Sequence, residues 1–216
     1  MNFIFLLNGI LDKKYDIDFF KKYNCIVCID GGYENFLELN LNLQPDYIIG
    51  DFDSIKNFGE KTKNFDKEKI IFKDNQDESD SQFALKYILE KYKNEDIKNI
   101  DFIFVTTTSR IDHLLCNILL LKQVPTNINS KFITKEQELF LLRNRANIIG
   151  HSGRTLSVIP LTNVKGLTIK GCKWDLDNYD CNFGFIGGIS NIVEKNQAEI
   201  SVQEGECIIV ITYEYL

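Results

Sequence analysis

The first half of the chain repeats one pattern, in which a short apolar run ends in a turn with acidic or glycine residues and a helical stretch follows. Strands that are covered by helices on both faces of a parallel sheet read as continuous apolar runs. The repeat therefore predicts an α/β fold with an open, mainly parallel sheet flanked by helices. The runs that we assign to its strands are residues 2–7, 25–29, 46–49, 69–72 and 101–105.

Three segments between or after these runs have apolar side chains at helical spacing. They cover residues 33–41, residues 80–92 and a stretch that begins at Ile111. Ser79 to Gln82 matches the capping box that begins many helices. From Ile111 on, the apolar residues recur at i, i+3, i+4, i+7 and i+8, which predicts a core-facing helix.

After about residue 125 the helical periodicity fades and short β-rich runs appear between glycine turns. We therefore expect an α/β domain over residues 1–125 and an all-β sandwich domain over residues 126–216. The runs that we assign to strands of the second domain are 131–134, 138–142, 155–160, 166–170, 185–189, 197–202 and 207–213.

Composition narrows the classes of function. A chain of 216 residues that is 44% hydrophobic can bury a proper core, and its formal charge of -6 argues against binding to nucleic acid, which needs clustered basic residues. The opening apolar run is too short for a membrane span or a secretory signal, so we expect no membrane association. The six cysteines contain no second CxxC pair, which favours free thiols in the cytoplasm.

Carboxylates follow several of the expected strands. Asp51 and Asp53 are two residues apart, so at a strand end they project to the same side with Cα atoms roughly 7 Å apart. Carboxylates gathered at one sheet edge repel each other unless they share a hard cation, which predicts Mg²⁺ and a phosphate substrate. The alternative for Gly50 to Ser54 is a solvated turn, since aspartate, serine and glycine are common there.

Two further acidic segments are ambiguous when taken singly. Asp77 and Asp80 flank Ser79, and acidic residues at a helix start are favoured by the helix dipole alone. Their place after an expected strand favours a second reading, as part of the same site. Asp30, followed by Gly31 and Gly32, also ends a strand, and glycines let a backbone approach phosphate or ribose closely.

Arg110, His113 and Asn117 are expected to share the polar face of the helix that begins near Ile111, with Asp112 beside them. They can equally be the solvated face of an amphipathic helix. The chain has only two histidines, which favours oxygen ligands over a multi-histidine metal centre. Trp174, the single tryptophan, is either packing of the β domain or a stacking surface for a flat cationic ligand, and Ser190 and Asn191 supply small polar groups nearby.

Taken together and in this order, the segments resemble thiamine pyrophosphokinases over nearly the whole chain. The matching segments are Asp30-Gly31-Gly32, Pro45 to Ser54, Asp77 to Asp80, Arg110 to His113 with Asn117, Gly171 to Leu176, and Ile189 to Asn191. The resemblance implies transfer of the pyrophosphoryl group of ATP to thiamine, giving thiamine diphosphate and AMP. It also implies a homodimer with active sites between the first domain of one subunit and the second domain of the other.

The resemblance further implies roles for individual residues. Catalysis would use Asp51, Asp53, Asp80 and Asp112, and the first three would hold Mg²⁺. Our own hypothesis of the mechanism adds Asp80 as the acceptor of the hydroxyl proton. Thiamine would lie against Trp174, Ser190 and Asn191. The residues expected to contact ATP are Asp30, Gly31, Gly32, Asp77, Ser79, Arg110, His113 and Asn117.

The chain departs from the family pattern at three places. Thr108 and Ser109 stand where the family usually has two glycines, Tyr33 replaces a small residue after the Asp-Gly-Gly segment, and Gln137 is the nearest counterpart of an asparagine. Two alternatives therefore stay open. One is a kinase or pyrophosphokinase for another hydroxymethyl heterocycle such as a pterin, and the other is a sensor that binds thiamine or nucleotide without catalysis.

Overall fold

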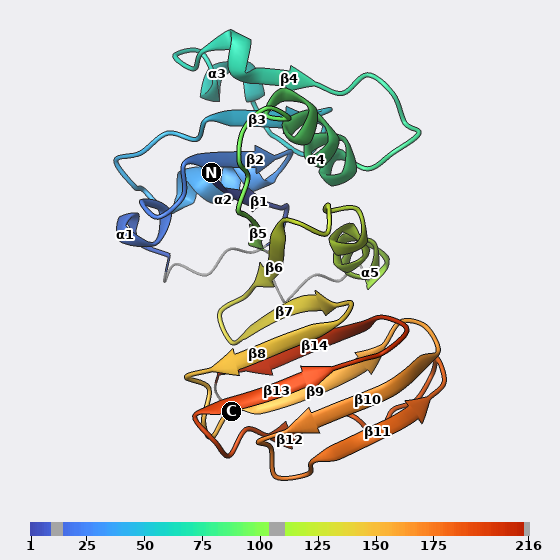
Figure 1. Cartoon of the computed structure of the whole chain (residues 1–216). Coiled ribbons are helices and arrows are strands. Elements are labelled where there is room, and N and C mark those ends of the chain that lie inside the picture. The colour runs from blue at the N-terminus through green and yellow to red at the C-terminus, as the bar shows by residue number, and fades with distance from the viewer. Residues whose placement is uncertain (10–14, 104–110, 214–216) are drawn as a thin grey trace. The chain divides into compact units, whose positions relative to one another are not determined.

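The computed structural model describes residues 1–9, 15–103 and 111–213, and the chain divides into two compact units, Met1–Lys135 and Glu136–Leu216 (Figure 1). The division falls after Lys135 rather than after residue 125. The reason is that the strand Asn129–Ile133, which the sequence pattern groups with the second half, pairs in parallel with Asn99–Ile103 of the first unit. The expected order of an α/β unit and then an all-β unit is found.

The strands of the first unit are β1 (Asn2–Leu6), β2 (Cys25–Ile29), β3 (Tyr47–Gly50), β4 (Ile70–Phe72), β5 (Asn99–Ile103) and β6 (Asn129–Ile133). They lie in the order β6-β5-β1-β2-β3-β4, and each neighbouring pair is parallel. All carboxyl ends therefore meet at one edge, and the chain order reverses between β1 and β5. In open α/β sheets ligands bind at this edge, next to such a reversal.

Helices connect these strands. They are α1 (Ile17–Phe20), α2 (Gly32–Glu38), α3 (Phe58–Lys61), α4 (Asp80–Lys91) and α5 (Ile111–Leu119), with the 3₁₀ turns η1 (Lys67–Lys69) and η2 (Leu120–Lys122). Alternate residues of β1 face opposite sides of the sheet. Ile4 belongs to the core cluster that contains Phe36 of α2, whereas the ring of Phe3 contacts Tyr92, which follows α4, at 5.0 Å between centroids. Both faces of the sheet are thus covered.

The helix expected from Ile111 is present as α5, but the prediction that its apolar stripe faces the core is wrong. Ile111, Leu115 and Leu119 are all exposed, and no described residue of α5 is buried. Periodicity tells which side chains share a face of a helix and not what covers that face.

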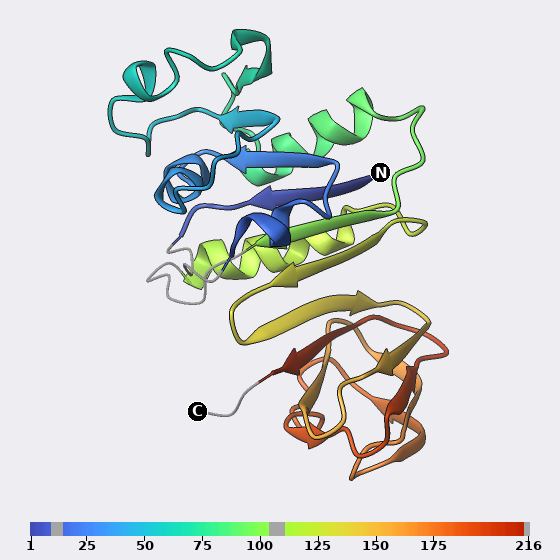
Figure 2. The ribbon, with the colours of Figure 1, turned by 90° about the vertical axis from the view of Figure 1, so that its left-hand side faces the viewer.

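The second unit consists of antiparallel strands in two sheets (Figure 2). The orders are β12-β9-β14-β7 and β11-β10-β13-β8, and buried residues from both sheets form one core cluster. The strands are β7 (Gln137–Leu142), β8 (Arg145–Ile149), β9 (Thr155–Pro160), β10 (Val164–Lys170), β11 (Leu176–Cys181), β12 (Asn191–Ile192), β13 (Gln197–Ser201) and β14 (Cys207–Thr212).

The sequence pattern misplaces some strands of this unit. Residues 185–189 do not form the expected strand: Gly187 and Gly188 lie in a turn, and a Cβ on Gly188 would be 2.5 Å from the carbonyl oxygen of Val158 in β9. β8 and β11 were not anticipated. β11 is mostly exposed and rich in polar residues, so it lacks the apolar alternation by which strands are identified.

Two expectations about the whole chain can be compared with the structure. All six cysteines are free thiols, with Cys116 exposed and the others buried, as expected. No helix in the described ranges is long and apolar enough to cross a membrane.

Candidate functional site

Asp30 lies at the carboxyl end of β2 in a left-handed backbone conformation, with φ of 45°. Aspartate is among the few non-glycine residues that adopt this conformation readily. Its N–H donates to the carbonyl oxygen of Ile49 at 2.9 Å, which fixes the turn to the end of β3. The residue is only 6% exposed, and its Oδ1 is buried without a hydrogen-bond partner in the described part of the chain. A buried carboxylate oxygen without a partner calls for a ligand.

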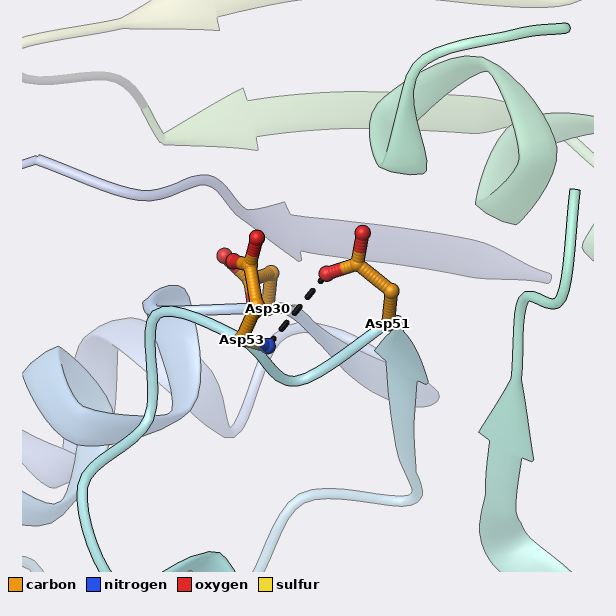
Figure 3. Close-up of side chains that lie close together, drawn as sticks. All are labelled: Asp30, Asp51 and Asp53. Carbon is orange, nitrogen blue, oxygen red and sulfur yellow. Dashed lines mark hydrogen bonds between the residues drawn. The ribbon is translucent and has the colours of Figure 1, made fainter. Parts of the chain in front are cut away.

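Asp51 and Asp53 follow the neighbouring strand, β3, and a tight turn directs them to the same place (Figure 3). Phe52 between them has φ of 64°, and the N–H of Asp53 donates to Oδ1 of Asp51 at 3.3 Å. The hydroxyl of Ser54 donates to Oδ1 of Asp53 at 3.0 Å. The turn thus folds back so that residues two apart present their carboxylates together.

Gly50 makes the approach of the two turns possible. A Cβ at this residue would lie 3.2 Å from the Cα atom of Asp30, and its φ of 154° is a conformation that side chains rarely adopt. Glycine therefore allows the ends of β2 and β3 to meet.

Asp30, Asp51 and Asp53 each offer a carboxylate oxygen, and these oxygens all lie within 4.8 Å of one another (Figure 3). We call this group the carboxylate cluster. Three carboxylates so close together repel one another, and a shared divalent cation offsets that repulsion. The all-oxygen donor set and the unpartnered Oδ1 of Asp30 fit a hard cation such as Mg²⁺.

Asp80, which the sequence analysis grouped with Asp51 and Asp53, lies at the first turn of α4 and outside the carboxylate cluster. Asp30 takes the third place instead, because it directly ends the strand next to β3. Burial raises the pKa of Asp80 above its usual value. The charge of Lys73 opposes this rise, while the charges of Asp51 and Asp30 add to it, so Asp80 lies within electrostatic reach of the cluster.

Ser79 is the N-cap of α4, and its Oγ accepts from the N–H of Gln82 at 3.2 Å, as the capping box predicts. Asp77 is exposed in the turn before it. Lys73, the first residue after β4, was missed by the sequence analysis. It is buried and lies 3.5 Å from Oδ1 of Asp80. A lone basic residue between a strand end and an acidic turn is the signal that marks it.

The glycines after Asp30 serve packing. A Cβ on Gly32 would lie 2.1 Å from the carbonyl oxygen of Leu6, so glycine allows α2 to begin directly against the end of β1. A Cβ on Gly31 would meet only the flexible side chain of Asn8, at 2.6 Å. From the sequence we expected the backbone at these glycines to approach a ligand closely. At Gly32 the backbone closely approaches β1.

The residues expected near ATP on α5 are only partly described. Arg110, Thr108 and Ser109 lie outside the described residues. Asp112 and His113 are exposed in the first turns of α5, whereas Asn117 accepts a hydrogen bond from Oγ of Ser81 at 3.0 Å. Asn117 thus joins α5 to the first turn of α4.

The second unit gathers the three residues expected to bind thiamine. Asn191 is buried, and its side chain accepts from the N–H of Trp174 at 3.1 Å and donates to the carbonyl oxygen of Trp174 at 2.7 Å. The indole itself is 55% exposed, and Nζ of Lys173 lies 4.7 Å from its ring centroid. Ser190, with φ of 60°, donates its N–H to Oγ of Ser157 at 3.0 Å. An aromatic face is thereby presented from a rigid backbone.

Comparisons with known proteins agree on one family. The family model described as "Thiamin pyrophosphokinase, catalytic domain" matches residues 18–132, and the one described as "Thiamin pyrophosphokinase, vitamin B1 binding domain" matches residues 143–207. The curated Thiamine pyrophosphokinase 1 of Oryza sativa subsp. japonica is 26% identical over 196 residues, which cover 81% of this chain and 74% of that protein.

Solved structures give the same result for the whole fold. The thiamine pyrophosphokinase of Bacillus subtilis has a TM-score of 0.80 at 26% identity and covers 99% of this chain and 100% of its own. The enzyme of Candida albicans has a TM-score of 0.81 at 22% identity and covers 99% of this chain and 89% of its own. With both parts of the family pattern matched in order and the carboxylate cluster inside the catalytic part, this chain belongs to the thiamin pyrophosphokinase family.

Proposed function

We propose that the protein transfers the pyrophosphoryl group of ATP to the hydroxyl of thiamine, giving thiamine diphosphate and AMP. The observation that supports this most is the carboxylate cluster at the carboxyl edge of the parallel sheet, within the segment that matches the catalytic family model. A site of this kind suits a polyanionic substrate that arrives with a divalent cation.

Asp30, Asp51 and Asp53 would hold Mg²⁺, and Asp80 stays a candidate for a further ligand, as expected from the sequence. When bound, the cation offsets the charge of the triphosphate and of the developing phosphate oxygens. The three side chains fix where that charge is offset, because each is attached to a turn at a strand end. Our candidates for contacts to ATP are Asp30, Gly31, Gly32, Asp77, Ser79, Arg110, Asp112, His113 and Asn117.

In the transfer, the hydroxyl oxygen of thiamine attacks the β-phosphorus of ATP and forms the new P–O bond. The bond from that phosphorus to the oxygen bridging the α- and β-phosphates breaks, and AMP leaves with the bridging oxygen. Asp80 is our candidate to accept the hydroxyl proton, because burial raises its pKa and a base is more effective when its pKa is nearer to the working pH.

Trp174, Ser190 and Asn191 are proposed to bind thiamine, a cation with flat heterocycles that suits an exposed indole face. Lys173 already lies near that face. Thiamine must therefore displace the lysine side chain or use the other side of the ring.

We also propose a homodimer in the cytoplasm. Exposed apolar side chains support the dimer, since exposed apolar surface commonly marks interfaces. They lie on α5 and in the segment from Trp174 to Ile189, and they are Ile111, Leu115, Leu119, Trp174, Tyr179, Phe183, Ile186 and Ile189. The six free cysteines suit a reducing compartment. Light scattering on the purified protein would contradict the dimer if it gave the mass of one chain.

The deciding experiment is incubation of the purified protein with ATP, Mg²⁺ and thiamine, followed by separation of nucleotides and thiamine esters. We expect AMP and thiamine diphosphate in equal amounts. AMP or ADP formed only with a hydroxymethyl pterin would support the other enzyme class instead. Tight binding of thiamine without consumption of nucleotide would support a sensor.

A further inference from the structure

The α/β unit buries a lysine beside the carboxylate cluster. Lys73 is 3% exposed, although a lysine ammonium is strongly hydrated and rarely becomes buried without a partner. Its backbone N–H donates to the carbonyl oxygen of Gly50 at 2.9 Å, and Gly50 immediately precedes Asp51. The backbone of the lysine is thus fixed to the strand end that carries two of the cluster's carboxylates.

The ammonium of Lys73 contacts the segment between β4 and α4 at two points. It donates to the carbonyl oxygen of Glu78 at 2.8 Å and lies 3.5 Å from Oδ1 of Asp80. The second distance is an ion-pair contact that is longer than a hydrogen bond. The buried ammonium of Lys73 therefore contacts both the turn before α4 and the carboxylate of Asp80, the first residue of α4.

A second lysine, Lys86, contacts the same turn through the side chain of Glu78. Lys86 pairs with Oε2 of Glu78 at 2.6 Å, but its own side chain is largely exposed. The Glu78 side chain is itself only 16% exposed, so replacing Lys86 breaks an ion pair of the same turn while it leaves the contact between Lys73 and Asp80 in place. Lys86 is therefore the matched control for Lys73.

The carboxylate cluster makes this buried charge necessary. Asp80 would be repelled by the neighbouring carboxylates, and without a cation of its own the turn would move toward solvent. Displacements of about 1 Å at a reacting centre can cost roughly 10²-fold in rate. A residue that keeps Asp80 in place therefore matters for the reaction even though it does not touch the reacting atoms.

We propose that Lys73 is a positioning residue for pyrophosphoryl transfer, whose buried ammonium keeps the turn from Asp77 to Asp80 and the Asp80 carboxylate at the edge of the carboxylate cluster. The proposal rests on the function proposed above. It assigns to this lysine a role that depends on charge and acts through Asp80.

The test compares Lys73→Met, Lys73→Arg and the control Lys86→Met with the unmodified protein. For Lys73→Met we expect a fall in kcat of roughly 10- to 100-fold, with the KM for thiamine changed by less than about 2-fold. Lys73→Arg, which retains the charge, should recover part of kcat, and Lys86→Met should match the unmodified protein. Unchanged kcat in Lys73→Met, or equal losses in the Met and Arg variants, would overturn the proposal.

A double variant keeps the test decisive where Lys73→Met alone is poorly folded. Lys73→Met combined with Asp80→Asn removes both charges of the pair, so no unpaired charge stays buried. If the lysine acts through Asp80, the double variant has the kcat of Asp80→Asn alone. A further loss as large as that of the single Lys73→Met variant would show that the lysine acts independently, contrary to the proposal.

Thermal unfolding does not depend on catalysis, so it tests the positioning role of Lys73 separately from the proposed function. We expect Mg²⁺ to raise the Tm of the unmodified protein and of Lys86→Met equally, and to raise that of Lys73→Met less. Absence of AMP formation by the unmodified protein would refute the proposed function, while this pattern of Tm shifts would still support the positioning role. Equal shifts in all three proteins would refute the positioning role alone.

Discussion

Hydrogen bonds fix the backbones of both Asp30 and Trp174, but the two residues differ in exposure: Asp30 is 6% exposed and Trp174 is 55% exposed. At the end of β2 and β3, unusual backbone conformations bring like charges together. In the second unit, the buried Asn191 holds the backbone of Trp174 and leaves its ring in solvent. The first arrangement places like charges together at a buried turn, and the second leaves an aromatic face accessible to solvent.

The largest expected effect comes from removing one charge of the carboxylate cluster. Asp53→Asn should lower kcat by roughly 10²-fold, because a charge that organises the transfer is lost. Without Mg²⁺ the same variant should have a Tm no lower than the unmodified protein, since repulsion among the carboxylates falls. The measurements are AMP formation and thermal unfolding in EDTA.

The control is Asp18→Asn, which removes an exposed carboxylate of α1. It should leave kcat unchanged. If Asp53→Asn kept wild-type turnover at saturating Mg²⁺ and ATP, Asp53 would have no role in the reaction. The contrast between a charged and an aromatic region would then not hold.

The next effect tests whether close backbone packing underlies the charged region. Gly32→Ala places a Cβ at 2.1 Å from the carbonyl oxygen of Leu6, so it should lower the free energy of unfolding by about 1–3 kcal/mol. Gly59→Ala, in α3 with nothing within 4 Å of the added atom, should raise it by roughly 0.5–1 kcal/mol. Urea denaturation measures both, and equal changes in the two variants would contradict the packing argument.

A smaller effect is expected in the aromatic region. Trp174→Ala should raise the KM for thiamine roughly 3- to 30-fold and leave the KM for ATP nearly unchanged, because a cation–π contact contributes about 0.5–2 kcal/mol. Lys173→Met should lower the KM for thiamine slightly if the lysine competes for the ring. Tyr179→Ala, which removes an exposed ring of the following strand β11, is the control. Equal rises in both KM values for Trp174→Ala would place the indole outside the pocket.

The smallest effect concerns a carboxylate of α2 that is stabilised by a partner. The pKa of Glu34 is lowered, first by its hydrogen bond from Lys61. A lowered pKa in the folded protein contributes stability above the unfolded value of about 4.3, and that stability is lost as the pH falls through the folded pKa. Glu34→Gln should therefore cost less than about 1 kcal/mol at pH 7 and nothing at pH 2, by urea denaturation. A difference that persists at pH 2 would contradict this origin.

Much of the α/β unit could be predicted because its central strands β1, β2, β3 and β5 are buried on both faces and read as apolar runs. The positions of Asp51 and Asp53 followed from the same pattern, since a strand end fixes where the next residues point. The identity of the third carboxylate did not follow. Whether Asp30 or Asp80 joins the other two depends on which strand lies next to β3 and on the left-handed turn at Asp30, neither of which is local to Asp51.

Contacts between residues that are distant in sequence also explain the other differences between the expected and the observed structure. The apolar stripe of α5 was recognised, but periodicity does not tell whether core or solvent faces it. Lys73 is marked in the sequence only as a lone basic residue before an acidic turn, and its burial does not follow from that pattern, because it arises from the packing of β3, β4 and the acidic turn around it. Segments whose neighbours are distant in sequence are the ones that sequence reasoning cannot place.

The free thiols differ in accessibility, which allows labelling at a single site. Burial raises the pKa of Cys25 and Cys207 to about 12 and that of Cys172 to about 11, and it also raises the pKa of Cys28 and Cys181, so these thiols stay protonated and shielded at neutral pH. Cys116, on α5, is exposed. A maleimide dye should therefore attach at one position of the native chain without prior mutagenesis, and its fluorescence would report on α5 when nucleotide is added.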